Sequence, residues 1–277
     1  MLRFGILVAA LAIAGCDKGQ EQAVETTTGP GDAPAGQATP VAEVSAVAAQ
    51  DKPAKPAGPH GAYDPHAALS ADSMIKVALQ HRSEGRVTLA MQSIDEAAAR
   101  YPQDAEVLSV RGSLYLEQGK ITPALEDFEA SIRLRPDDAR TLVNRSQAYR
   151  QFGRDAEAMA DLDRAVALEP DLLPARFNRG VMFQEQERYE KALADFEHCV
   201  AVDPHAPAPY FNRAAAHDAL GDREAAVADL NRFLEIADDE EWKQAANDIL
   251  RAWRDQAAEA GADGAAGQGA DAPAGSE

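Results

Sequence analysis

The residues of this sequence that could do acid–base, nucleophilic or metal chemistry are two cysteines, many carboxylates and six histidines: His60, His66, His81, His198, His205 and His217. No two histidines stand four residues apart, the spacing that lets one helix face present two imidazoles to a metal ion. No glycine-rich phosphate loop follows a predicted strand, and no two carboxylates form a distinctive pair. We therefore predict no catalytic residue, no metal site, no cofactor and no small-molecule substrate.

The net charge of −19 excludes one class of partner. Nucleic-acid binding needs clustered lysines and arginines that neutralise phosphates, and this chain has 27 basic against 46 acidic residues. A charge of this size keeps a protein soluble and says little about its fold.

Four arginines recur together with four aspartates that follow them by sixteen residues. The pairs are Arg111 with Asp127, Arg145 with Asp161, Arg179 with Asp195, and Arg213 with Asp229. One repeat earlier both partners are lost together, because Val77 and Ser93 stand there. Joint presence and joint loss predict a structural ion pair between two helices in preference to a ligand site. An exposed pair of this kind would contribute only about 0–1 kcal/mol.

The elements that must position these residues repeat every 34 residues. Small residues recur at Ala90, Ala124, Ala158, Ala192 and Ala226, and a large apolar residue follows each by four, at Ile94, Phe128, Leu162, Phe196 and Leu230. A separation of four places both side chains on one helical face. Pro102, Pro136, Pro170 and Pro204 end the units, and Gly119, Gly153 and Gly221 mark a turn within them, where the remaining unit has Glu187. Each unit is therefore predicted to be two antiparallel helices that must stack on their neighbours to bury an apolar face.

This pattern resembles the tetratricopeptide repeat family. With repeat position 1 at Ala71, Ala105, Ala139, Leu173 and Pro207, the family's small residue at position 8 corresponds to Ala78, Gly112, Ser146, Gly180 and Ala214. Its aromatic residue at position 11 corresponds to His81, Tyr115, Tyr149, Phe183 and His217, so both histidines are expected to be packing residues. Cys199 falls at a small buried position and is expected to be an inert thiol.

The resemblance implies an all-α, right-handed solenoid. We expect five helix pairs near residues 71–104, 105–138, 139–172, 173–206 and 207–240. A capping helix over 241–258 would follow, because Trp242, Ala246, Ile249 and Trp253 form an apolar stripe. Display of this helix as a partner-binding element is the less favoured interpretation.

In the family the first helix of each pair lines a concave groove, and this implies a peptide-binding role for a second recurring set. Asn144, Asn178 and Asn212 occupy position 6 of three consecutive units, each preceded by an apolar residue, Val143, Phe177 or Phe211. An amide side chain offers a donor and an acceptor to one peptide unit. The alternative, that these asparagines recur through duplication and have structural roles, has equal weight.

The segments on either side of the repeats differ in composition. Residues 16–62 are rich in Gly, Pro, Ala and Thr and are expected to form a disordered linker, because they lack the apolar side chains that offset the entropy of ordering. The folded domain is expected over 63–258, and 259–277 is expected to be a disordered acidic tail.

The first fifteen residues combine Arg3 with an uncharged apolar run that is too short to span a bilayer, which is typical of a secretory signal peptide. Ile13-Ala14-Gly15-Cys16 resembles the bacterial lipobox. The resemblance implies cleavage before Cys16 and its lipidation with diacylglyceryl and fatty acyl (palmitate-type) chains, which give stable membrane anchoring. An ordinary signal peptide with Cys16 incidental is the alternative.

Together these observations predict a non-enzymatic lipoprotein of the bacterial cell envelope, with its body facing the periplasm, that acts as a protein-interaction adaptor. A structural spacer or self-associating scaffold is the alternative. The inner and the outer membrane are both open as the site of the anchor.

Overall fold

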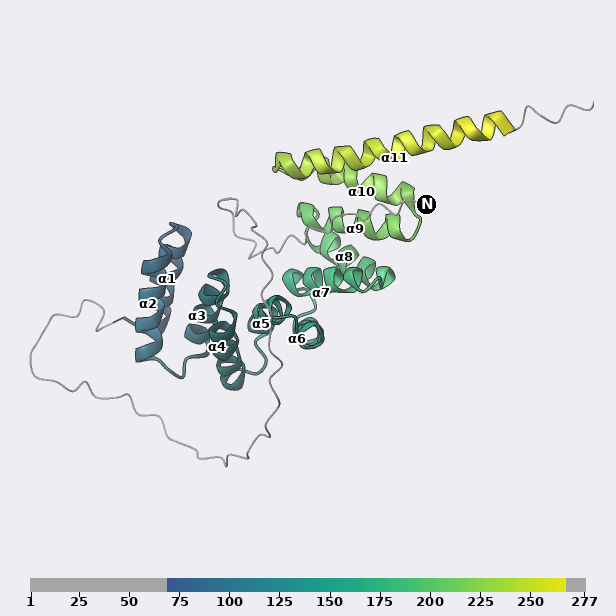
Figure 1. Cartoon of the computed structure of the whole chain (residues 1–277). Coiled ribbons are helices and arrows are strands. Elements are labelled where there is room, and N and C mark those ends of the chain that lie inside the picture. The colour runs from purple at the N-terminus through teal and green to yellow at the C-terminus, as the bar shows by residue number, and fades with distance from the viewer. Residues whose placement is uncertain (1–68, 268–277) are drawn as a thin grey trace, which may run out of the picture. The chain divides into compact units, whose positions relative to one another are not determined.

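The computed structural model describes residues 69–267, and within them the chain forms eleven α-helices and no strand (Figure 1). Each of five units contains a first helix and a second helix. The first helices are α1 (Ala71–Ser83), α3 (Ala105–Glu117), α5 (Ala139–Gln151), α7 (Leu173–Glu185) and α9 (Pro207–Ala219). The second helices are α2 (Val87–Arg100), α4 (Ile121–Leu134), α6 (Asp155–Leu168), α8 (Tyr189–Val202) and α10 (Arg223–Ile236), and α11 (Glu240–Gly267) follows. The predicted fold class, an all-helical tetratricopeptide-type solenoid of five helix pairs plus a further helix, is confirmed.

Local chemistry sets where the first helices begin. Asp104 and Asp138 stand before α3 and α5, and each carboxylate accepts hydrogen bonds from two backbone N–H groups of the first turn. These bonds satisfy donors that have no partner inside the helix. The helices α7 and α9 lack such a cap but carry proline in the first turn, where the missing N–H costs nothing.

The turn inside each unit needs a residue in the left-handed region. Gly119, Gly153 and Gly221 have φ of 70°, 78° and 86°, as the predicted turn requires. Glu187 occupies the same place in unit 4 with φ 58°, so this turn is formed without glycine.

The core follows the 34-residue pattern. The five recurring alanines from Ala90 to Ala226 are fully buried, and Phe128 and Phe196 are fully buried beside them. Each helix packs on the one before and the one after it, and consecutive first helices also touch. Neighbouring units therefore supply the apolar surface that one unit cannot bury alone.

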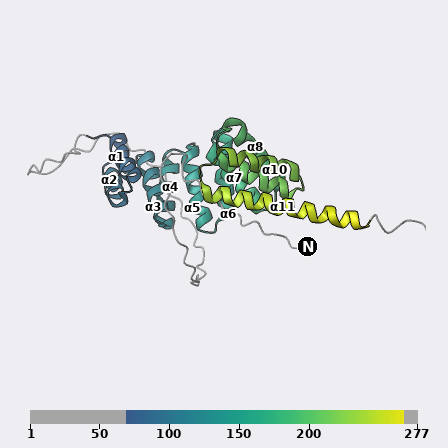
Figure 2. The ribbon, with the colours of Figure 1, turned by 90° about the horizontal axis from the view of Figure 1, so that it is seen from above.

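The last helix is longer than predicted. The expected capping helix ends at residue 258, whereas α11 continues to Gly267, so residues 259–267 are helical and the tail prediction that began at 259 is wrong there. Trp242, Ala246, Ile249 and Trp253 of α11 pack on the last unit. Both views show α11 running past α10 (Figures 1 and 2).

Several predicted features lie outside the described residues: the signal peptide at 1–15, Cys16, the linker at 16–62, residues 63–68 of the predicted folded domain and residues 268–277 of the predicted tail. No helix in the described part is long and apolar enough to cross a membrane.

Candidate protein-binding surface

The four Arg–Asp pairs lie inside the repeats and join the two helices of units 2, 3, 4 and 5. In unit 4, Arg179 Nε donates to Asp195 Oδ2 at 2.8 Å and a terminal nitrogen donates to Asp195 Oδ1 at 2.7 Å. The pairs of units 2, 3 and 5 have the same two-bond geometry, with donor–acceptor distances from 2.6 to 2.8 Å. The four aspartates are buried, and the hydrogen bond to Asp195 raises the pKa of Arg179. Their carboxylates are therefore enclosed within the units, where a partner cannot reach them.

Cations also stack on the aromatic rings at position 11. The Tyr149 ring has the guanidinium carbon of Arg145 at 5.3 Å and that of Arg154 at 4.5 Å from its centroid. Phe183 is flanked in the same way, with Arg188 at 4.5 Å. Neither cation over these rings was predicted from the sequence, although a base recurs at the start of the second helix at Lys120, Arg154 and Arg188.

The asparagine row does not form one continuous peptide clamp. Asn144 Nδ2 donates to Ser113 Oγ of the preceding unit at 3.1 Å. Asn212 Nδ2 donates to the Ala208 carbonyl one turn earlier at 3.0 Å. Asn178 is buried, and its Nδ2 has no hydrogen-bond partner among the described residues. The amide nitrogens of Asn144 and Asn212 are therefore engaged within the stack, whereas that of Asn178 is not.

The expected apolar contact surface beside the asparagines is wrong for two of its three residues. Val143 and Phe177 are each 4% exposed and belong to the core, and the Phe177 ring lies 5.8 Å from that of Phe196. Only Phe211 is partly exposed. Val143 and Phe177 belong to core clusters, and Phe177 packs on α8 of its own unit, whereas in unit 5 the chain continues into α11 instead of another unit.

Positions 6 and 9 show which parts of the first helices stay accessible. They are partly exposed in units 2, 3 and 5, as Val110 and Ser113, Asn144 and Gln147, and Asn212 and Ala215, and in unit 1 Lys76 is exposed and Leu79 partly exposed. In unit 4 the corresponding Asn178 and Val181 are buried. The accessible face is thus interrupted at α7 and falls into two patches.

The second patch borders a hollow, open to solvent, where α9, the end of α10 and the start of α11 meet. Phe211, Phe233 and Trp242 form an aromatic wall, with Phe211 centred 5.2 Å from each of the other two rings. The remaining lining residues are Pro207, Ala208, Asn212, Ala237, Asp238 and Asp239. Two residues of the predicted peptide-binding set, Phe211 and Asn212, therefore do line a hollow.

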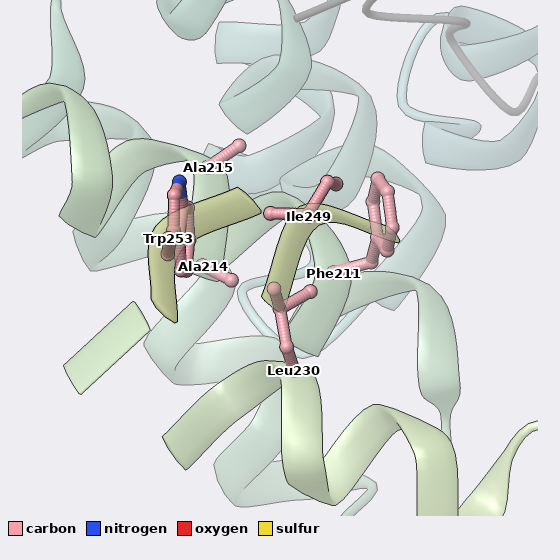
Figure 3. Close-up of a pocket in the computed structure, with 6 residues that line it drawn as sticks. All are labelled: Phe211, Ala214, Ala215, Leu230, Ile249 and Trp253. Atoms are coloured by element: carbon pink, nitrogen blue, oxygen red, sulfur yellow. The ribbon is translucent and has the colours of Figure 1, made fainter. Parts of the chain in front are cut away.

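A second, shallower recess lies under α11 and is lined only by apolar side chains. Figure 3 shows Ile249 and Trp253 of α11 with Ala214 and Leu230 of the last unit around this recess. These contacts, together with the packing of Trp242 on Phe211, hold α11 against the last unit.

Reactive side chains in the described residues form no catalytic arrangement. Burial raises the pKa of the Cys199 thiol to about 12, so the thiolate is scarce at neutral pH. His81 and His217 sit at position 11 among packing residues. No group of three or more histidine, cysteine or acidic side chains between residues 69 and 267 could hold a metal ion.

Comparison with known proteins supports the repeat assignment. Models described as tetratricopeptide repeat match residues 109–172, 146–208 and 208–240. No curated protein matches the chain in sequence.

Solved structures of tetratricopeptide proteins resemble the chain. TTC0263, a thermophilic protein of Thermus thermophilus, is 22% identical with a TM-score of 0.55, over 65% of this chain and 99% of that one. YrrB, described as having an unusual peptide-binding site, is 21% identical with a TM-score of 0.51, over 65% of this chain and 92% of its own. MamA of Desulfovibrio magneticus RS-1 is 19% identical with a TM-score of 0.52, over 60% of this chain and 94% of that one. At these identities the resemblance establishes the fold alone.

Proposed function

We propose that this tetratricopeptide-repeat chain is a lipid-anchored adaptor of the bacterial cell envelope that binds a segment of a partner protein on the accessible faces of its first helices. The repeat assignment supports a role in protein–protein interaction. Anchoring through Cys16 rests on the Ile13-Ala14-Gly15-Cys16 motif. A body facing the periplasm follows from the same signal peptide.

One observation carries the binding proposal: the polar groups inside the repeats are used to hold the units together, while two outward patches remain. The Arg–Asp pairs and the stacked cations are engaged within units. Gln147 in unit 3 and Phe211 with Asn212 in unit 5 stay partly exposed. A chain without a catalytic arrangement in its described part, but with such patches, fits a binding role better than a catalytic one.

A self-associating scaffold is the second function, and a different observation favours it. Exposed apolar side chains recur at 34-residue intervals near the ends of three second helices: Leu134 is 46% exposed, Leu168 37% and Val202 47%. A row of this kind offers apolar area to another copy of the chain.

Site-directed photo-crosslinking in living cells distinguishes the two functions. A photoreactive residue is introduced in place of Gln147 or Asn212 on the first helices, and in place of Leu168 on the second helices. The adaptor predicts crosslinks to another protein from the first two positions. The scaffold predicts crosslinks to a second copy from Leu168 and none from Gln147 or Asn212, and that outcome would overturn the adaptor.

The anchor is tested separately, with the full chain and its Cys16→Ser variant. The native chain is expected to incorporate labelled palmitate and to sediment with membranes. The variant is expected to lose both, and a variant that still incorporates palmitate would contradict the assignment of Cys16.

A further inference from the structure

We infer that the hollow between α9, α10 and α11 binds a lysine or arginine side chain of a partner protein. This inference rests on the proposed adaptor function and names the kind of group that one of the two patches recognises. The supporting observations are the shape of the hollow, its aromatic wall and an acidic residue on its rim that has no ion-pair partner among the described residues.

The hollow offers apolar surface that a long basic side chain can cover. Phe211 and Trp242 are only partly buried, and their rings meet edge to face at 83°. Lysine and arginine carry a methylene stem that packs on such surface while the charged end stays in water. A cation over an aromatic face gains further attraction.

The rim of the hollow carries hydrogen-bond acceptors and no positively charged side chain. Asp238 is exposed and makes no ion pair with any described residue. Asp239 uses one carboxylate oxygen to accept from the Trp242 backbone N–H at 2.9 Å. The amide nitrogen of Asn212 is occupied by the Ala208 carbonyl, and its oxygen accepts no hydrogen bond from the described part of the chain. The hollow is therefore built for a donor that carries positive charge.

Basic side chains of this chain near the hollow are already committed elsewhere. Lys243, next to Trp242, pairs with Glu240 at 2.9 Å. Arg213 is held by Asp229, and Arg232 pairs with Glu235 at 2.8 Å. The Asp238 carboxylate thus makes no ion pair within residues 69–267. Its charge adds to the net charge of −19, which attracts a basic binding partner.

The same chain shows what such aromatic surfaces bind. In units 2, 3 and 4 the ring at position 11 has cations stacked over it, and Arg223 lies 4.3 Å from the Trp253 ring centroid. Within the described residues, no such contact involves Phe211, Phe233 or Trp242. Phe211 and Trp242, which are both partly exposed, form an aromatic surface of the same type with no cation from residues 69–267 on it.

The test uses the full chain and the fluorescence of Trp242. In the Trp253→Phe variant, Trp242 is the remaining tryptophan of the two. The probe is the peptide acetyl-Gly-Lys-Gly-Arg-Gly-Lys-Gly-amide, and the control probe has glutamate at the three basic positions. We expect a saturable change of Trp242 emission with the basic probe and none with the acidic probe. In the Trp242→Phe variant the remaining Trp253 should respond to neither probe.

The decisive variant is Asp238→Asn, which removes a charge that makes no ion pair within the described residues. Exposed ion pairs contribute about 0.2–1 kcal/mol, so the basic probe should bind about 1.5- to 5-fold more weakly. The matched control is Glu126→Gln, an exposed acid on α4 that changes the net charge equally. Asp238→Lys should weaken the probe further, and raising the salt to about 1 M should suppress binding, because exposed charges are then screened within about 3 Å.

The inference is overturned if the basic probe gives no saturable response, if both probes respond alike, or if Asp238→Asn and Glu126→Gln have equal effects. Should Trp253→Phe not fold, calorimetric titration of the native chain against Asp238→Asn gives the same comparison. Crosslinking from Asn212 to a partner that persists unchanged in Asp238→Lys would refute the basic-side-chain site while leaving the adaptor function standing.

Discussion

Replacing Gly180 by alanine tests whether small and large residues are matched inside each unit. A Cβ atom at Gly180 would lie 2.7 Å from Cε1 of Phe196 and 3.1 Å from two further ring carbons. Phe196 is fully buried and cannot swing into solvent. In unit 2, Gly112 faces Phe128 in the same way, at 2.8 Å.

The other units solve the same contact differently. Where position 8 carries a Cβ, as in Ser146 and Ala214, the facing residue is leucine, Leu162 or Leu230. Glycine with phenylalanine and a larger residue with leucine therefore represent two packings of one contact. A Cβ at position 8 facing phenylalanine should destabilise the unit, whereas the same Cβ facing leucine should not.

The magnitude follows from two opposing effects. Overpacking a filled core costs about 1–3 kcal/mol. Alanine is better than glycine inside a helix by about 1 kcal/mol. Gly180→Ala alone should therefore lower the free energy of unfolding by about 1 kcal/mol, within a range of about 0–2 kcal/mol. In the Phe196→Leu background the clash is gone, and the same change should raise the free energy of unfolding by up to about 1 kcal/mol.

Urea unfolding followed by circular dichroism at 222 nm measures the cycle of native chain, two single variants and the double variant. The expected coupling is about 1–3 kcal/mol in favour of the double variant. The control combines Gly180→Ala with Phe128→Leu, two units away, where the effects should add within about 0.5 kcal/mol. If Gly180→Ala changed the free energy of unfolding equally in the native chain and in Phe196→Leu, the packing argument would be refuted.

Three further predictions concern the ion pairs, the thiol and the anchor. Asp195→Ala should cost about 2–4 kcal/mol in urea unfolding, because Arg179 loses a buried partner, whereas Glu185→Ala, which removes a 40%-exposed partner of Arg150, should cost less than about 1 kcal/mol. Cys199 should resist iodoacetamide at pH 8 until the chain unfolds. Burial raises the pKa of Cys199 from 9.0 to about 12, so on raising the pH the unfolded chain loses this proton before the folded chain does. The stability that the neutral thiol contributes is therefore complete below pH 9 and is lost as the pH rises toward 12. In Cys199→Ala the free energy of unfolding should fall less steeply over this alkaline range. Cys16→Ser should release the chain from membranes, as measured by fractionation.

Much of the fold could be predicted because the repeat imposes the same physics five times. The first helices begin at Ala71, Ala105, Ala139, Leu173 and Pro207, the residues that the family register places at position 1. The sixteen-residue spacing of arginine and aspartate matches the distance between facing turns of the two helices in a unit. Both features depend on contacts within one unit, and a periodic sequence contains the information for them.

The binding surface could not be predicted in the same way, because it depends on how closely neighbouring first helices approach. Position 6 carries asparagine in three units, yet Asn178 is buried and Asn144 is partly exposed. The hollow beside Phe211 depends on where α11 packs, and α11 has no counterpart in the repeat. Its extension to Gly267 escapes prediction because alanine-rich sequence with scattered glycines indicates disorder by composition, although alanine is the strongest helix former.

The composition of the last unit explains why an open aromatic surface lies at that end of the stack. In units 2, 3 and 4 a base opens the second helix and stacks on the aromatic ring at position 11. In unit 5, Asp222 stands in that place and caps α10 by accepting from the Ala225 N–H at 3.1 Å, and His217 replaces the ring. The basic residue of unit 5 comes one position later, at Arg223, and stacks on the Trp253 ring of α11. In units 2, 3 and 4 this cation–ring contact joins the two helices of one unit, and in unit 5 the corresponding contact attaches α11 to the last unit. The start of α11 then brings Trp242 against Phe211, which leaves an aromatic wall beside Asp238, an acid with no ion-pair partner in the described part, where no further unit covers it.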